Sequence, residues 1–209
     1  DFDSIIHSWA VQGLNYYAAA RLNWDPYLSA DDILESYCRP GFGAGADLVK
    51  RYFLRIQDIT ADPDRDFSLR ALSELRELLN AADRAAADEE EVGDRIAFLR
   101  MGLNFTLLQR TLDRMSDRAR ENPKTVDRER ARELLELNYF LMRDIVRNHN
   151  LAVNVSYLMW GNGDYARWSP IGGRGYRPSR KLIMKWDAYN RRARKERAEM
   201  AKMGLPADA

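Results

Sequence analysis

The sequence predicts an all-α protein, an antiparallel bundle of about six or seven helices. Apolar residues recur at three- and four-residue steps through most of the 209 residues, which is the spacing of one face of an α-helix. Proline, glycine and asparagine separate these segments, and the short connections favour packing between consecutive helices. The sequence has no internal repeat of fixed period. We therefore expect a single helical domain over residues 1–209.

The first half of the chain holds four predicted helices. The first covers about residues 3–23 and stops at Trp24-Asp25-Pro26, because proline disfavours helix in the residue before it. Ser29 is the expected N-cap of a short second helix that ends near Tyr37. The segment "CRPGFGAG" (residues 38–45) then reads as a breaker, and its glycines are typical of a helix C-cap and turn. The remaining two helices are expected over about residues 46–59 and 67–87.

The second half continues the pattern as far as residue 150. A helix is expected over about residues 95–120, with Gly93 as a candidate break before it and Thr125 as the cap of the next helix. The apolar segment "LAVNVSYLMW" (residues 151–160) is compatible with helix or strand, and we favour helix because no partner strand is evident. Two segments follow: a glycine-rich loop (161–178) and a basic terminal helix and tail (179–209).

Composition argues against several classes of function. The chain carries 33 basic and 32 acidic residues, so its net charge of +1 gives no reason to expect a nucleic-acid partner. Its apolar runs fall short of the roughly 20 residues that a membrane span needs. Cys38 is the one cysteine, and His7 and His149 are the two histidines, which weakens any zinc or Ser-His-Asp interpretation. We expect no metal site and no cofactor.

Sequence motifs for catalysis are absent as well. The chain has no phosphate-binding loop of the Walker type, no dinucleotide fingerprint after a strand, no HExxH and no GxSxG. Its carboxylates lie mostly in charged helical segments, where solvated or ion-paired surfaces are the usual outcome. The catalytic residues, if the chain has any, are therefore unknown from the sequence. For the basic tail, a solvated helix is favoured over a membrane-binding one.

The N-terminal helix is the strongest anomaly, because "WAVQGLNYYAAARLNW" (residues 9–24) is aromatic on more than one side. A helix with apolar groups on several faces usually touches two layers. Gly13 costs up to about 1 kcal/mol relative to alanine in a helix interior, so another backbone or a ligand is expected close to it. From the helical step we expect Trp9 and Tyr17 to face the bundle, with Gln12 and Tyr16 nearer an external surface.

The stretch from Trp9 to Phe53 resembles part of a family of large bacterial carbohydrate-active proteins. The resemblance rests on Trp-x-x-Gln-Gly-Leu-Asn-Tyr-Tyr as it stands here from Trp9, with Gln12 and Gly13 in the middle, then on Trp-Asp-Pro and on "YCRPGFG". The segment "DRIAFLRMGLNFTLLQRTLDRM" (residues 94–115) is also similar to later helices of that region. Members of the family look like glycoside hydrolases that have an α-glucuronidase-like N-terminal domain, a family-20-like barrel and a helical C-terminal region.

The resemblance implies that this chain is the helical C-terminal part of a larger glycoside-hydrolase-like protein. The start at Asp1 rather than Met agrees with that expectation. The catalytic barrel of the same parent would be its partner, carbohydrate a further one, and the chain alone would not be catalytic. Five residues are candidates for the rim of the active site or for the domain interface: Trp9, Gln12, Asn15, Tyr16 and Trp24.

Two other functions stay open at this point. The alternatives are a stand-alone helical module that binds a partner protein and a dimerisation module, neither of them enzymatic. The resemblance favours a periplasmic or secreted location and leaves a cytoplasmic one open. The sequence does not identify the sugar, the oligomeric state or the role of the loop 161–178.

Overall fold

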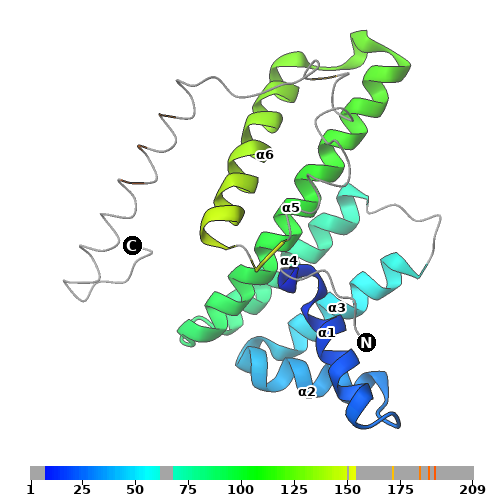
Figure 1. Ribbon diagram of the computed structural model, residues 1–209, viewed down its shortest axis with the longest axis vertical. Coiled ribbons are helices and arrows are strands. Elements are labelled where there is room, and N and C mark those ends of the chain that lie inside the picture. The colour runs from blue at the N-terminus through cyan, green and yellow to red at the C-terminus, as the bar shows by residue number, and fades with distance from the viewer. Residues whose placement is uncertain are drawn as a thin grey trace.

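The computed structural model describes residues 8–61, 68–149 and 151–153, together with the single residues Ile171, Met184, Ala188 and Arg191. All regular structure in that part of the chain is helical, which confirms the all-α class (Figure 1). Most of the predicted loop 161–178 and terminal segment 179–209 lies outside the described residues, as do residues 3–7 of the first predicted helix and residues 154–160.

Consecutive α-helices are joined by short connections. The α-helices are α1 (Trp9–Trp24), α2 (Ala30–Phe42), α3 (Ala46–Thr60), α4 (Leu69–Ala85), α5 (Glu90–Glu121) and α6 (Arg128–Asn148). Two 3₁₀ turns, η1 (Gly43–Gly45) and η2 (Pro123–Thr125), join α2 to α3 and α5 to α6. Ser29 is the N-cap of α2, as expected, and forms a reciprocal capping box with Asp32.

Three predicted boundaries are wrong. Helix α2 does not end near Tyr37 but continues through Pro40 to Phe42, and Gly43, with a φ of 44°, is the residue that stops it. Gly93 lies inside α5 because the flanking buried Val92 and Ile96 outweigh the small helix penalty of one glycine.

The third correction concerns the start of α6. Asp127, not Thr125, is its N-cap, and the Asp127 carboxylate accepts a hydrogen bond from the Arg130 amide at 3.0 Å. The Thr125 hydroxyl instead donates to the Asn122 carbonyl within the 3₁₀ turn. The N-cap of α6 lies two residues later than predicted, because Pro123 starts a short 3₁₀ turn between α5 and α6.

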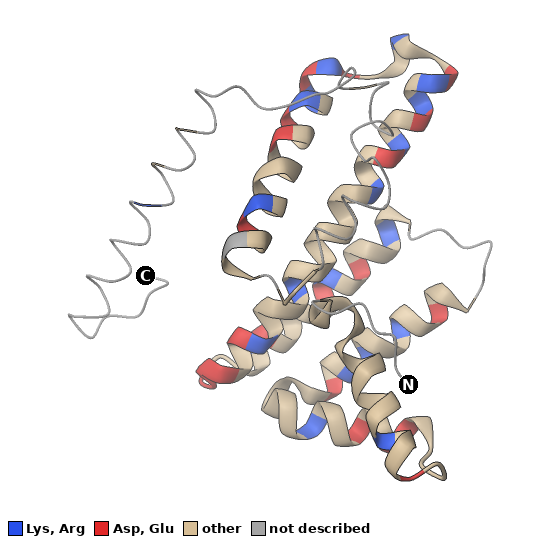
Figure 2. Cartoon of the chain, viewed as in Figure 1, with Lys and Arg blue, Asp and Glu red and all other residues tan. Residues whose placement is uncertain are grey.

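Helix α5 organises the molecule, because it contacts α1, α2, α4 and α6 (Figure 1). Around its N-terminal half, α4 is packed between α3 and α5, and Leu72, Leu75 and Leu79 of α4 are fully buried there. Around its C-terminal half, α6 is packed against it with Leu112 and Leu135 in the contact, and Ile171 belongs to the same buried cluster. Acidic and basic side chains are interspersed along most of these helices, and the acidic run 88–91 lies at the start of α5 (Figure 2).

Candidate functional site

Helix α1 is anchored to the bundle at its first turn. Gly102 of α5 permits this close crossing: a Cβ there would lie 3.0 Å from Val11 and 3.1 Å from the Ala10 Cβ. The first amides of α1, which have no partner inside the helix, donate to the carbonyls of Leu151 and Ala152 at 2.8 and 3.0 Å. Beyond this crossing α1 runs along α2, and it makes no extensive contact with α3 or α4.

One face of α1 is packed on α2 through Gly13 and Tyr17. A Cβ at Gly13 would meet the Tyr37 hydroxyl at 3.4 Å, so a side chain of α2 is what approaches this glycine, not a second backbone. The Tyr17 hydroxyl lies 3.4 Å from the Ser36 carbonyl oxygen. In a regular helix that carbonyl would accept from residue 40, but Pro40 has no amide hydrogen. The Tyr17 hydroxyl therefore lies beside the acceptor that Pro40 leaves open, and at 3.1 Å it also donates to the Ser36 hydroxyl oxygen.

The outer face of α1 carries Trp9, Gln12 and Tyr16, three of the five predicted site residues, and Asn15 lies at its edge, where it also lines a second cavity. The Trp9 and Tyr16 rings meet edge-on with their centroids 4.9 Å apart. Gln12 and Asn15 are exposed beside them, and their side-chain amides are 3.5 Å apart. The expectation that Trp9 faces the bundle is wrong, since 46% of this residue is exposed. Residues seven apart are separated by only about 20° on a helix, so Trp9 shares the face of Tyr16.

Trp24, the fifth predicted residue, lies apart from the other four at the far end of α1. It is 91% exposed, and Tyr27 in the turn that follows is 94% exposed. Asp25 fixes this turn by accepting a hydrogen bond from the Tyr27 amide at 3.1 Å. Two large aromatic side chains therefore project from the α1–α2 turn with almost no contact to the rest of the described chain.

Trp9 borders an open cavity of about 450 Å³ between α1, α2 and α5, which we call the aromatic cleft. Its walls include the rings of Trp9, Tyr37, Phe42 and Phe98, and the charged side chains at its edge are Asp94 and Arg95. Arg95 is held in place because its guanidinium donates to the Gly41 carbonyl at 3.0 Å and pairs with Glu91. Burial raises the pKa of Tyr37, so its hydroxyl stays protonated at the cleft wall.

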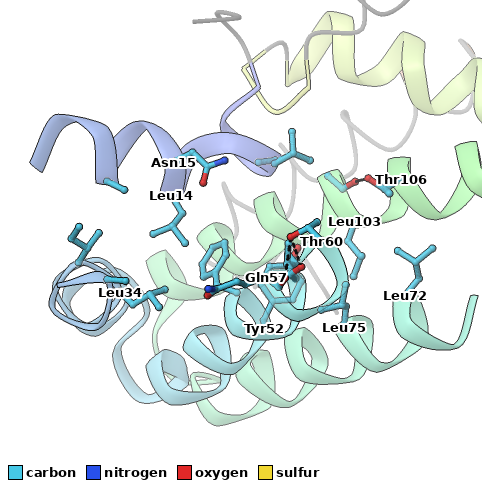
Figure 3. A pocket seen from close by; sticks show the side chains of 18 of the residues that line it. Leu14, Asn15, Leu34, Tyr52, Gln57, Thr60, Leu72, Leu75, Leu103 and Thr106 are labelled. Carbon is cyan, nitrogen blue, oxygen red and sulfur yellow. Dashed lines mark hydrogen bonds between the residues drawn. The ribbon is translucent and has the colours of Figure 1, made fainter. Parts of the chain in front are cut away.

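A larger cavity of about 670 Å³, which we call the apolar groove, lies between α1 and helices α2 to α5 (Figure 3). Leu14, Ala18 and Leu22 of α1 follow each other at four-residue steps along one wall. The buried side chains of Tyr52, Leu72 and Leu75 lie beneath, on α3 and α4. The remaining wall comes from α2 and from Leu103 and Thr106 of α5.

The polar groups of the apolar groove are few and uncharged. Thr106 donates its hydroxyl to the Gly102 carbonyl at 3.0 Å, and Thr60 donates to the carbonyls of its own helix. Asn15 and Gln57 are the exposed amides among the lining residues. The groove therefore presents aliphatic surface over most of its length and amides where it meets solvent.

Neither cavity has the arrangement of a metal centre. Among the described residues, no group of three or more His, Cys, Asp and Glu side chains is placed to hold a metal ion. Within that same part of the chain, no helix is both long and apolar enough to cross a bilayer. The resolved pKa shifts of carboxylates belong to the surface pairs Ser29–Asp32, Glu35–Arg39 and Glu74–Arg55, and none of these residues lines either cavity.

Sequence reasoning found the outer face of α1 but missed the apolar groove and the α5 side of the aromatic cleft. The four-residue spacing of Leu14, Ala18 and Leu22 is a signal for the groove wall that the sequence contains. Asp94 and Arg95 carry no local signal, because they reach Trp9 only through the packing of α5 on α1 and α2. Comparison of the chain with known protein families, with curated proteins and with solved structures found no match.

Proposed function

We propose that this chain is the helical C-terminal domain of a bacterial carbohydrate-active protein. In this proposal the domain packs on a glycoside-hydrolase-like barrel of the same parent, catalyses nothing by itself, and contacts sugar through the aromatic cleft. The support from sequence is the resemblance carried by residues 9–53 and 94–115. Both stretches border the cleft, since one supplies Trp9 and the other supplies Asp94 and Arg95.

The observation that carries the proposal is the half-exposed Trp9 ring next to a carboxylate and a guanidinium. An indole offers a flat apolar surface suited to the C–H face of a sugar ring. Asp94 can accept hydrogen bonds from sugar hydroxyls, and Arg95 can donate to their oxygens. A concave site with apolar walls and a few convergent polar groups is the usual form of a small-ligand site.

The test is isothermal titration calorimetry of the chain with gluco-, xylo-, chito- and glucurono-oligosaccharides. We expect saturable binding of at least one of them, and at least tenfold weaker binding by Trp9→Ala and by Asp94→Asn. Trp24→Ala is the matched control, because it removes an exposed tryptophan of the same helix outside the cleft. Absence of binding by every sugar, or an equal loss in the Trp24 variant, would overturn the proposal.

The same protein should show no turnover of aryl glycosides. A glycosidase needs two carboxyl groups on either side of the scissile bond, and the charged side chains at the cleft edge are Asp94 and Arg95, so one carboxylate is present where two are needed. Release of the aryl group, followed by absorbance, is the measurement. Sustained turnover that a single substitution in this chain abolishes would contradict the assignment of catalysis to another part of the parent.

A second candidate function is a protein-interaction module, and the α1–α2 turn favours it. Trp24 and Tyr27 are almost fully exposed, and aromatic side chains of this kind are enriched in protein interfaces. Sedimentation velocity of the wild type and of a Trp24→Ser/Tyr27→Ser variant distinguishes the functions. A dimer that becomes monomeric in the variant, with no sugar binding in either protein, would favour the interaction module.

A further inference from the structure

The two charged side chains at the edge of the aromatic cleft differ in whether they have a partner. The Arg95 guanidinium donates to the Gly41 carbonyl at 3.0 Å and to the Glu91 carboxylate at 3.1 Å. The Asp94 carboxylate makes no hydrogen bond or ion pair within the described part of the chain. Consecutive residues of a helix do not face each other, so Arg95 does not pair with its neighbour. The cleft edge therefore carries one negative charge that nothing there balances.

The surface next to this carboxylate is aromatic. Asp94 and Phe98 are one turn apart on α5, so their side chains lie on the same face of that helix. The other rings that line the cleft are those of Trp9, Tyr37 and Phe42. The face of an aromatic ring attracts cations, that of an indole most strongly. Tyr37 adds no second negative charge, because burial raises the pKa of its phenol.

From the unpaired carboxylate and the aromatic walls we propose that the aromatic cleft selects sugars that carry a protonated amino group. This inference rests on the proposed sugar contact and names the class of sugar. Trp9 offers a flat surface to the sugar ring, and Asp94 on the same cleft accepts hydrogen bonds from the ammonium group. Such charge-assisted hydrogen bonds are roughly twice as strong as those of a neutral hydroxyl or acetamide.

An acidic sugar is the alternative that a guanidinium at the cleft would suggest. The charge of Arg95 is already opposed by Glu91, with which it is paired. A sugar carboxylate brought to Arg95 would also approach Asp94, its neighbour in the sequence. Like charges brought together in a binding site weaken the complex. The charges of the cleft therefore disfavour an acidic sugar.

The test uses three β-1,4-linked trisaccharides that differ in the group at C2: hydroxyl in cellotriose, acetamide in the N-acetylglucosamine trimer and ammonium in the glucosamine trimer. Each is titrated into the 209-residue chain by calorimetry at about pH 6, below the ordinary pKa of an amine. We expect the glucosamine trimer to bind at least about fivefold more tightly than both neutral sugars, the gain of one exposed ion pair and one cation–π contact. The preference should decrease at high salt.

Matched substitutions locate the source of the preference. Asp94→Asn keeps the shape of the side chain and removes its charge, so this variant should bind the three trisaccharides about equally. Asp88→Asn is the control, because it removes an exposed carboxylate of the acidic run 88–91 that does not line the cleft, and it should keep the preference. Trp9→Ala should weaken binding of all three sugars. Circular dichroism and thermal melts establish that each variant is folded.

Each way of failing gives a different result. If the three sugars bind the wild type equally, the selection of an amino group is wrong and the proposed sugar contact stands. If no sugar binds, both proposals are wrong. If Asp94→Asn and Asp88→Asn lower the preference equally, the ammonium is attracted by the acidic surface in general and not by the cleft. If tetramethylammonium binds as tightly as the glucosamine trimer, the cleft recognises a cation without its sugar, and this inference is overturned.

Discussion

Glu89 and Gly43 together hold the corner where α2 turns into α3. The Glu89 carboxylate accepts a hydrogen bond from the Ala44 amide at 2.9 Å, and negative charge is favourable at the start of the helical segment that follows. Gly43 has a φ of 44°, which L-residues rarely adopt, and a Cβ on it would overlap the Glu89 carboxylate. Any side chain at Gly43 therefore strains the backbone and displaces the cap.

We expect Gly43→Ala to lower the free energy of unfolding by about 1–3 kcal/mol from backbone strain alone. Displacement of Glu89 adds to this loss. Gly41→Ala is the matched control, because a Cβ at this helical position meets nothing within 4 Å, and alanine there should gain up to about 1 kcal/mol. Urea unfolding of both variants is the measurement. If Gly43→Ala left the free energy of unfolding unchanged, the strained backbone of Gly43 and the Glu89–Ala44 hydrogen bond would not be what stabilises this corner.

At the same scale, the five site residues predicted from sequence separate into two groups. Trp9, Gln12, Asn15 and Tyr16 lie together because they fall within neighbouring turns of one helix. Trp24 is separate, since it is at the opposite end of that helix. The helical step separated Trp9 from Gln12 and Tyr16 and misassigned Trp9 to the core, because exposure depends on where α2 and α5 pack.

At the scale of elements, Pro40 and Tyr17 explain how α2 contains a proline and still packs on α1. Proline removes the amide that would bond the Ser36 carbonyl, and the Tyr17 hydroxyl lies near both that carbonyl and the Ser36 hydroxyl, at 3.4 and 3.1 Å. The consequence is a side-chain contact between α1 and α2 at the point where α2 lacks one backbone hydrogen bond.

A double-mutant cycle tests this connection. Tyr17→Phe alone should cost about 0.5–1.5 kcal/mol, the usual contribution of one hydrogen bond. In a Pro40→Ala background the Ser36 carbonyl regains an amide partner within α2, so the same change should cost less, with a coupling energy of at least about 0.5 kcal/mol. The two losses are obtained from urea unfolding. Equal losses in both backgrounds would show that Pro40 and Tyr17 act independently.

The contact between α5 and α6 contains a buried polar pair. Asn138 of α6 is fully buried, and its side-chain oxygen accepts a hydrogen bond from Gln109 of α5 at 2.7 Å. The Asn138 amide points to the Met142 sulfur at 3.1 Å. Because a buried amide is costly without its partner, this pair favours one register of α6 along α5, which apolar packing alone specifies less sharply.

At the scale of the whole molecule, the pH dependence of stability follows from two glutamates, which titrate at acidic pH, and from one cysteine, which titrates at alkaline pH. Hydrogen bonds from Arg39 and then Lys50 lower the pKa of Glu35, and those from Arg55 and Arg70 lower that of Glu74. A carboxyl group with a lowered folded pKa stabilises the protein above its ordinary pKa, and this contribution is lost as the pH falls. Stability should therefore decrease below about pH 4.5, the ordinary pKa of glutamate.

The stability of the protein at alkaline pH depends on Cys38. Burial raises the pKa of its thiol from the ordinary 9.0 to about 12, so between these values the unfolded chain loses a proton that the folded chain keeps. This contribution to stability is fully present below pH 9.0 and is lost as the pH rises. We expect the urea midpoint to fall between pH 9 and 11, and to fall less in Cys38→Ala. An unchanged midpoint over that interval in the wild type would contradict the burial of the thiol.

The amino-acid sequence by itself determined that the protein is helical and where most helices begin and end. The reasons are local: apolar spacing, the Ser29 capping box and the proline after Trp24 act within a few residues. The sequence also pointed to α1 as the unusual helix, because its apolar residues surround it.

Only the tertiary structure decided what those apolar faces of α1 meet. Gly102 lets α1 cross α5 closely at one end, and α1 then diverges along α2, which leaves room for the apolar groove and for the aromatic cleft. Asp94 and Leu72 reach these cavities from helices far along the chain. Such contacts depend on how whole helices cross, and the spacing of residues within one helix holds no information about that.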